Sequence, residues 1–305
     1  MSFKPFWGHK MSDVENAVTE LKNGVPVGIP TETVYGLAAD TMNPLAIRRV
    51  FALKERPLSH PLIVHVNGIE QAERVAQLTP CARDLIDRFW PGPLSLILPR
   101  NEIVPDEVTA GLQTVAVRCP KHPLALSLLS YFELGLVAPS ANKFGQVSPT
   151  TAAHVRREFS AELLVLDGGS CEVGIESTIL DLSTQIPAIR RPGTITKEVL
   201  EALIGPLGSS QTAAPGTHAA HYAPHTSLLI TDDIETELQR LSHLSAAVLY
   251  RSDSEDYAHR LYAELRRLDS LGVDVLIAEK PNSDPVGRAV LDRLLRAEHG
   301  SKFSK

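Results

Sequence analysis

Basic side chains stand at the ends of several apolar or helical stretches in the first two thirds of the chain. Lys54 and Arg56 follow a helical stretch, Arg118 ends the apolar run TVAVR, and Arg190 and Arg191 precede a Pro-Gly turn. Lysine and arginine bind phosphate and carboxylate oxygens through charge-assisted hydrogen bonds. Because an arginine that ends a buried strand is costly to leave unpaired, we expect Arg118 to meet an anion or a carboxylate. Lys54 and Arg56 could instead favour the dipole of the preceding helix, and Arg190 and Arg191 could be a solvated pair.

Short hydroxyl and amide side chains form a second set of candidates. Residues 138–142 are Ala-Pro-Ser-Ala-Asn, residues 148–150 are Ser-Pro-Thr, and residues 30–37 are PTETVYGL. Such side chains, beside exposed backbone N–H groups, suit phosphate or ribose binding. They also form turns and cap helices, so each motif alone is weak. They lie at strand ends and turns, where α/β proteins build ligand sites.

The three cysteines, Cys81, Cys119 and Cys171, are widely separated and form no CxxC pair. A disulfide framework or a zinc cluster is therefore not expected, and a reducing compartment fits. Cys171 follows a Gly-Gly-Ser stretch, which suggests a nucleophile as an alternative. No histidine is near it in the sequence and no nucleophile motif surrounds it, so we do not assign it that role.

Composition and charge restrict the class of protein. The 305 residues are 43% hydrophobic and 22% charged, which is typical of a soluble globular protein. The apolar runs are too short for a membrane span and the first residues contain no apolar signal segment, so we expect a cytoplasmic protein without membrane contact. The net charge is −6, whereas proteins that grip long nucleic acids usually carry a basic surface. The charge therefore favours a small anionic substrate.

Apolar runs that alternate with amphipathic stretches predict an α/β first part with a mixed sheet. A helix is expected from Ser12 or Asp13 to Lys22, with Gly24 as its stop, and a second from Pro44 to about Leu53. Further helices are expected at residues 69–78, 81–89, 123–131, 151–159 and 197–204. Strands are expected at residues 25–29, 62–66, 94–98, 114–117, 134–138, 163–166, 177–182 and 188–190.

A break is predicted near residues 205–225, where a stretch rich in Gly, Pro, Ser and Thr has no apolar period. Beyond it, strand–helix units at residues 227–241, 246–271 and 273–297 predict a small parallel Rossmann-like domain. No GxGxxG turn follows its first strand, so we expect no dinucleotide there. We expect a catalytic domain at 1–207, a linker at 208–225 and a C-terminal domain at 226–305.

Taken in order, these motifs resemble one known family. PTETVYGL, KERPLSHPLIVHV, FWPGPLSLIL, TVAVRCP, APSANKFGQVSPT, GIESTILDL and RRPG occur in the order found in threonylcarbamoyl-AMP synthases, which have the YrdC-like fold. The resemblance covers essentially the whole first part, and APGTHAAHYAP at 214–224 resembles the linker of two-domain members. It implies an α/β fold with a strongly twisted mixed sheet, a positively charged concavity and a second, smaller Rossmann-like domain.

The resemblance implies a reaction of L-threonine, bicarbonate and ATP that releases pyrophosphate. Mg²⁺ would be bound through the ATP phosphates, with no protein metal ligand. The carbamate of threonine must attack the α-phosphorus, so the protein has to neutralise and align two anions rather than supply a nucleophile. A downstream transferase would use the product for tRNA modification, and contact with tRNA itself would be weak or indirect.

Roles for particular residues also follow from the resemblance. Lys54, Arg56 and Arg118 would be catalytic, and the guanidinium fork of Arg118 would hold the threonine carboxylate. Asn142 and Lys143 would assist. The threonine pocket would be formed by Thr33, His65, Arg118, Ala138 and Ser177. ATP would be contacted by Lys54, Arg56, His60, Thr114, Ser140, Ser148, Arg191 and Tyr222.

Tyr222 belongs to the predicted linker. A linker that reaches back over the site would exclude water, so we expect residues 214–224 to act as a lid. Two features depart from the family pattern. His60 stands where the family usually has Asn, and the C-terminal domain, residues 226–305, is shorter than in other two-domain members.

Two alternatives share the fold. A non-catalytic RNA-binding module would use the concavity on a duplex, but the acidic composition and the intact motifs argue against it. An enzyme that adenylylates carbamoyl phosphate would usually be a larger chain with acylphosphatase-like or zinc-finger motifs, which this sequence does not contain. The sequence therefore favours adenylylation of carbamoylated threonine.

Overall fold

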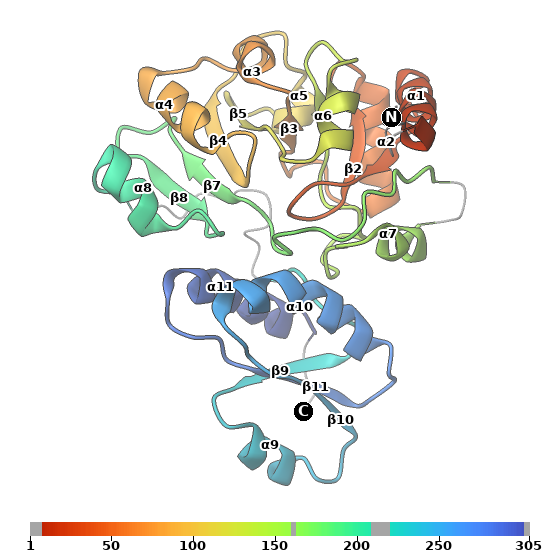
Figure 1. Cartoon of the computed structure of the whole chain (residues 1–305), viewed down its shortest axis with the longest axis vertical. Coiled ribbons are helices and arrows are strands. Elements are labelled where there is room, and N and C mark those ends of the chain that lie inside the picture. The colour runs from red at the N-terminus through yellow and green to blue at the C-terminus, as the bar shows by residue number, and fades with distance from the viewer. Residues whose placement is uncertain (1–7, 160–162, 209–219, 302–305) are drawn as a thin grey trace, which may run out of the picture.

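The computed structural model describes residues 8–159, 163–208 and 220–301 (Figure 1). The first part is built on an eight-stranded sheet in the order β1-β2-β6-β3-β5-β4-β7-β8. Pairs β3–β5 and β4–β7 are parallel, and the other neighbours are antiparallel. The expected mixed α/β sheet is confirmed. The strands are β1 Val27–Ile29, β2 Gly36–Asp40, β3 Ile63–His65, β4 Leu94–Pro99, β5 Thr114–Arg118, β6 Leu136–Val137, β7 Thr178–Asp181 and β8 Ala188–Arg191.

The helices of the first part begin at capping residues that the sequence displays. The Asn43 side chain accepts from the Ala46 N–H and the Thr79 hydroxyl accepts from the Ala82 N–H, and a proline opens both helices. The expected helices are present, within a few residues at their ends. They are α1 Gly8–Lys22, α2 Pro44–Lys54, α3 Ile69–Val75, α4 Pro80–Phe89, α6 Pro123–Leu129, α7 Ala152–Glu158 and α8 Lys197–Ile204, with a short additional α5 Asp106–Thr109.

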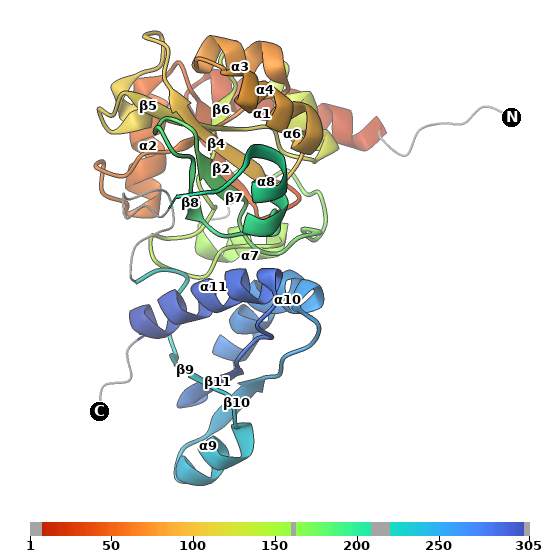
Figure 2. The ribbon, with the colours of Figure 1, turned by 90° about the vertical axis from the view of Figure 1, so that its left-hand side faces the viewer.

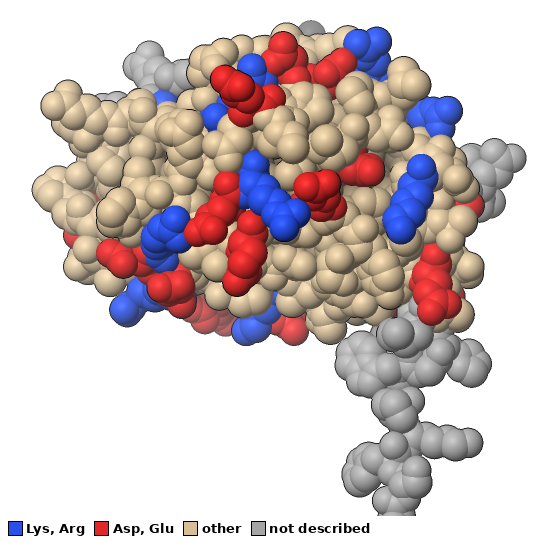
Figure 3. Space-filling view, turned by 90° about the horizontal axis from the view of Figure 1, so that it is seen from above, with Lys and Arg blue, Asp and Glu red and all other residues tan. Residues whose placement is uncertain are grey.

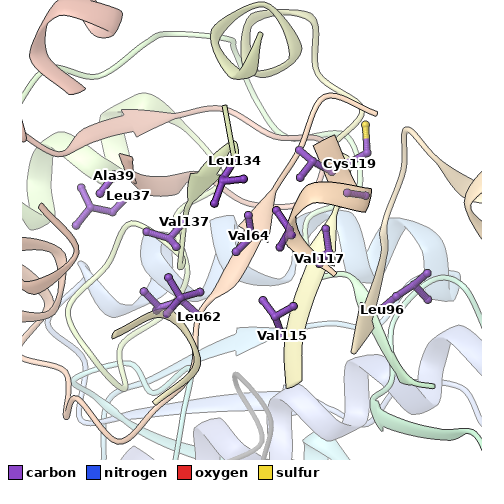
Figure 4. Close-up of a cluster of buried hydrophobic side chains, with 14 of the residues drawn as sticks. Leu37, Ala39, Leu62, Val64, Leu96, Val115, Val117, Cys119, Leu134 and Val137 are labelled. Atoms are coloured by element: carbon purple, nitrogen blue, oxygen red, sulfur yellow. The ribbon is translucent and has the colours of Figure 1, made fainter. Parts of the chain in front are cut away.

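The two-residue period of the central strands decides which side chains reach the site. Val64 of β3 and Val117 of β5 are fully buried in the main core with Leu62 and Val115 (Figure 4). Their neighbours in sequence point to the opposite face of the sheet. The parallel register pairs His65 with Arg118. Two polar residues at the carboxyl ends of β3 and β5 are thereby set side by side.

Three expectations about the first part are wrong. The stretch 163–166 forms no strand and makes only a single bridge, between Val165 and Gly28 of β1. Strand β2 was not expected, because Gly36, the two alanines and Asp40 have weak strand propensity and follow a polar turn. Burial of β2 between β1 and β6 overrides that propensity. Helix α1 begins at Gly8, ahead of the expected Ser12 or Asp13.

The second part is a small sheet of three parallel strands in the order β10-β11-β9, as expected for a Rossmann-like domain. Helices α10 and α11 lie between this sheet and the first part (Figures 1 and 2). The elements are β9 Ser227–Thr231, α9 Ile234–Arg240, β10 Ala246–Leu249, α10 Ser254–Asp269, β11 Val275–Glu279 and α11 Pro285–Ser301.

The two parts share a hydrophobic core. Val34, Val147 and Ile175 of the first part pack in one cluster with Tyr222 and with buried residues of α10 and α11. The division into domains at 207 and 226 stays a prediction, and residues 209–219 of the expected linker lie outside the described residues. Within the described residues, none of the helices has both the length and the apolar character needed to span a membrane.

Candidate active site

A cavity opens where the carboxyl ends of β3 and β5 meet the turn before β2 and the loop after β6. Most of the residues expected to bind substrates line it. They are Thr33, Arg56, His65, Arg118, Ala138, Ser140, Arg191 and Tyr222. The sequence interpretation assigned no role to four further polar residues that lie in or against it, namely Thr31, Glu32, Glu176 and His221.

Arg118 meets a carboxylate at one end of the cavity. Its Nη2 is 2.8 Å from Oε1 of Glu32, and both side chains are almost fully buried. The contact is not aligned as a hydrogen bond, and neither Glu32 oxygen has another hydrogen-bond partner among the described residues. The Arg118 Nε donates to the Gly92 carbonyl at 3.3 Å. This pair is therefore held electrostatically and keeps hydrogen-bonding capacity for a ligand.

His65 lies beside Arg118 and is neutral at physiological pH. Burial, and then the Arg118 charge, lower its pKa to about 3. At neutral pH an imidazole with such a pKa is a hydrogen-bonding group and a poor proton acceptor. This end of the cavity combines one guanidinium group with neutral hydroxyl and imidazole groups. That combination suits a small ligand with a carboxylate and hydroxyl or amine groups.

Two more guanidinium groups line the cavity near Tyr222, and we refer to this part as the other end of the cavity. Arg56 donates from Nη2 to the Pro61 carbonyl at 2.9 Å, and burial lowers its pKa only to about 10, so it is charged at neutral pH. Arg191 donates from Nε and Nη2 to the backbone and hydroxyl oxygens of Ser177, at 3.0 and 3.1 Å. With Ser140 they form a surface that fits phosphate oxygens.

Among the described residues that line this cavity, Glu176 is the one with a carboxylate. Burial disfavours its charged form, but Arg293 and Arg191 and the hydrogen bonds from Ser148 and Tyr262 outweigh burial and lower its pKa to about 2. It is therefore negative at neutral pH. Three arginines against Glu176 and the Glu32 that pairs with Arg118 leave the described part of the site with a net positive charge.

His221 and Tyr222 close one side of the cavity. Both are buried, and Tyr222 has a positive φ of 62°, a conformation that non-glycine residues seldom adopt. Burial lowers the pKa of His221 to about 3 and raises that of Tyr222 to about 12, so both are neutral. The described end of the expected lid, residues 220–224, thus lies against the cavity, and residues 214–219 lie outside the described residues.

Three of the expected site residues lie directly behind the lining. Ser148 donates to Glu176 Oε1 at 2.6 Å, and Ser177 receives the Arg191 hydrogen bonds. Lys54 is buried in α2, and its Nζ donates to the carbonyl oxygens of Ser140 and Asn142 at 2.5 and 2.6 Å. These residues fix the groups that line the cavity.

Two other expected ATP contacts lie further away. Thr114 begins β5 whereas Arg118 ends it, which separates their Cα atoms by roughly 13 Å at the usual rise of a strand. The His60 ring lies 5.1 Å from the Phe144 ring rather than in the cavity lining. Lys143, expected to assist, forms an ion pair with Glu55 at 2.7 Å. The functional roles of all these residues stay predictions.

Cys171 does not have the properties of a nucleophile. It is buried, and burial raises the pKa of its thiol to about 12. The thiolate is the reactive form, so this cysteine is inert at neutral pH.

The fold and the cavity define an α/β protein in which strand ends and loops present three arginines, the buried Arg118 and Arg191 and the partly buried Arg56, to a cavity that suits a small anionic ligand. Comparison with known proteins identifies the family. A family model described as "Telomere recombination" matches residues 19–193, and one described as "Threonylcarbamoyl-AMP synthase, C-terminal domain" matches residues 195–298. The chain belongs to the threonylcarbamoyl-AMP synthase family, in its two-domain form, and is an enzyme of this type.

Full-length relatives support this assignment. The threonylcarbamoyl-AMP synthase of Pyrococcus abyssi is 38% identical, over 91% of each chain. That of Bacillus subtilis is also 38% identical, over 94% of this chain and 93% of the relative. The crystal structure of P. abyssi Sua5 complexed with L-threonine superimposes with a TM-score of 0.88, at 36% identity over 94% of each chain.

Proposed function

We propose that this enzyme makes threonylcarbamoyl-AMP and pyrophosphate from L-threonine, bicarbonate and ATP. The observation that carries the proposal is one cavity that is lined by Arg118 beside His65, by Arg56 and Arg191 near Tyr222, and by Ser140. The threonine amine and bicarbonate give a carbamate and water. A carbamate oxygen then attacks the α-phosphorus of ATP, the bond to the bridging oxygen breaks, and pyrophosphate leaves.

The polarity of Arg118 and His65 assigns their end of the cavity to threonine. Arg118 binds the threonine carboxylate, and the neutral His65 orients the substrate by hydrogen bonding. Because the pKa of His65 is about 3, this histidine does not accept the proton that the threonine ammonium must lose, and the proton goes to solvent. Glu32 holds the Arg118 guanidinium in place through their ion pair.

The ATP end has to offset the charge of the triphosphate. Arg56 and Arg191 bind phosphate oxygens, and Ser140 and Ser148 orient the nucleotide. Among the described residues there is no group of three or more His, Cys, Asp or Glu side chains that could hold a metal ion. A Mg²⁺ ion would therefore be held by phosphate oxygens, where it would neutralise charge on the leaving pyrophosphate.

The proposal also covers the compartment of the enzyme and its partners. We place it in the cytoplasm, because its cysteines are free. A downstream transferase would consume the product for tRNA modification. On the face shown in Figure 3, basic and acidic side chains are intermixed, and a mixed surface of this kind fits weak or indirect contact with tRNA.

The proposed reaction is tested by pyrophosphate release. We expect release from ATP and Mg²⁺ only when both L-threonine and bicarbonate are present, with serine and valine as matched amino-acid controls. Serine lacks the methyl group of threonine and valine lacks its hydroxyl group. Release that does not depend on threonine or on bicarbonate would overturn the proposal.

Replacement of Tyr222 tests the proposed lid. In Tyr222→Ala we expect ATP affinity to fall about tenfold and the yield of threonylcarbamoyl-AMP per pyrophosphate to decrease, because water reaches the labile product. Tyr250→Ala is the control, since Tyr250 is 59% exposed in the second part. Calorimetry with ATP and chromatography of the products give the two values. If both are unchanged in Tyr222→Ala, residues 220–224 do not act as a lid.

A further inference from the structure

A buried carboxylate connects the cavity with the C-terminal part. Glu176 lies just before β7, and its Oε1 accepts from Ser148 at 2.6 Å. Its Oε2 accepts from the Tyr262 hydroxyl at 2.8 Å and from Arg293 Nε at 3.0 Å. Tyr262 belongs to α10 and Arg293 to α11. Both carboxylate oxygens therefore accept hydrogen bonds. The donor to Oε1 belongs to the first part of the chain, and the donors to Oε2 belong to the C-terminal part.

Tyr262 and Arg293 contact further parts of the ATP end. Arg293 Nη2 donates to the Pro192 carbonyl at 2.8 Å, in the turn directly after Arg191. The Tyr222 ring stacks on the Tyr262 ring with centroids 5.5 Å apart, and the Arg293 guanidinium lies 5.5 Å from the Tyr222 centroid. Both side chains are fully buried. Two residues of the C-terminal part thus hold the Glu176 carboxylate, the 191–193 turn and the Tyr222 ring.

The charge of Arg293 beside Glu176 affects how strongly the cavity binds an anion. A buried carboxylate needs a positive partner. Arg293 supplies that partner to Glu176 through a direct hydrogen bond, while Arg191 donates to Ser177. Arg191 also lowers the pKa of Glu176, so without Arg293 it would have to compensate Glu176 alone, and less of its charge would act on an anion in the cavity.

We propose that Tyr262 and Arg293 are positioning residues for the nucleotide: through Glu176 they hold Ser148 and leave Arg191 directed at the phosphates. The C-terminal part is then a component of the active site. This inference rests on the proposed function for the identity of the anionic ligand, ATP.

A pair of matched variants on one helix tests the proposal. Tyr262→Phe removes the hydroxyl that donates to Glu176 and keeps the ring against Tyr222. Tyr257→Phe is the control, because Tyr257 is also fully buried in α10 and its hydroxyl donates to the Glu279 carbonyl, within the C-terminal part. We expect Tyr262→Phe to weaken ATP binding about tenfold with L-threonine binding unchanged, and Tyr257→Phe to leave both unchanged. Unchanged ATP affinity in Tyr262→Phe, or an equal loss for both ligands, overturns the proposal.

The charge argument has its own test. Arg293→Met leaves Glu176 with less compensation, so ATP affinity should fall more than in Tyr262→Phe. In the double variant Arg293→Met/Glu176→Gln, both charges are gone, and we expect ATP affinity to recover toward that of Glu176→Gln alone. Arg293→Lys, which keeps a positive charge, should lie between wild type and Arg293→Met. If the losses in the two single variants simply add in the double variant, Arg293 does not act by neutralising Glu176.

ATP affinity is measured by calorimetry without threonine or bicarbonate, which separates this proposal from the proposed function. A wild-type enzyme that binds ATP but releases no pyrophosphate with threonine overturns the proposed function, and the variant titrations still decide the positioning role. A wild-type chain that does not bind ATP overturns both.

Discussion

In Arg118→Met we expect the affinity for L-threonine to fall at least about a hundredfold, while the affinity for ATP changes by less than about threefold. Arg118 is the guanidinium group whose charge acts on His65, whereas the charges of Arg56 and Arg191 both act on Tyr222. Methionine keeps an unbranched stem, although it is shorter than arginine, and removes all of its donors. Titrations of the purified variant with each substrate give the two affinities.

The same substitution also affects folding, because it leaves Glu32 buried without a counter-ion. Breaking a buried ion pair in this way costs about 3–5 kcal/mol of stability. The double variant Arg118→Met/Glu32→Gln removes both charges, so we expect its melting temperature to recover while threonine affinity stays low. Arg190→Met is the matched control, because Arg190 forms an ion pair with Asp181 that is equally buried. Arg190→Met should lose stability and keep its affinity for threonine. Normal threonine binding by Arg118→Met/Glu32→Gln would contradict the role of Arg118.

Local signals in the sequence were sufficient to predict most elements of the fold. Asn43-Pro44 places a side-chain acceptor and a proline at the first turn of a helix, and α2 begins there as expected. Thr79-Pro80 does the same for α4, which begins at Pro80, one residue ahead of the expected start. Apolar runs such as residues 94–98 mark buried strands. Strand β2 was missed because glycine and alanine carry little strand preference, so its formation depends on pairing with β1 and β6.

The candidate site was predictable where a residue's own position carries the signal. Arg118, as a charged residue at the end of an apolar strand, had to meet a partner, and it does. The identity of that partner was not predictable, because Glu32 stands in a polar turn far from Arg118 in sequence. Glu176 and Arg293 are 117 residues apart, on different parts of the chain. Only the packing of α10 and α11 on the first part brings them together.

Lys54→Met is expected to reduce threonine-dependent pyrophosphate release at least about a hundredfold, since displacement of a binding group by about 1 Å can cost this much. The Lys54 Nζ donates to the carbonyls of Ser140 and Asn142 and so fixes the loop that carries the Ser140 hydroxyl into the cavity. Methionine fills the same volume but cannot donate. ATP affinity and the rate of release are the quantities to measure.

The expected effect of Lys54→Met on stability is small, and this separates misplacement of the loop from unfolding. Burial lowers the pKa of Lys54 well below its usual value, which means that the charged ammonium is unfavourable in the folded chain. Methionine removes that penalty while it takes one donor from two carbonyl oxygens, of which that of Ser140 still accepts from the Asn142 N–H at 3.0 Å, so the two changes oppose each other. Lys197→Met, on the exposed face of α8, controls for the loss of one positive charge. Normal release by Lys54→Met would show that the loop holds its position without this lysine.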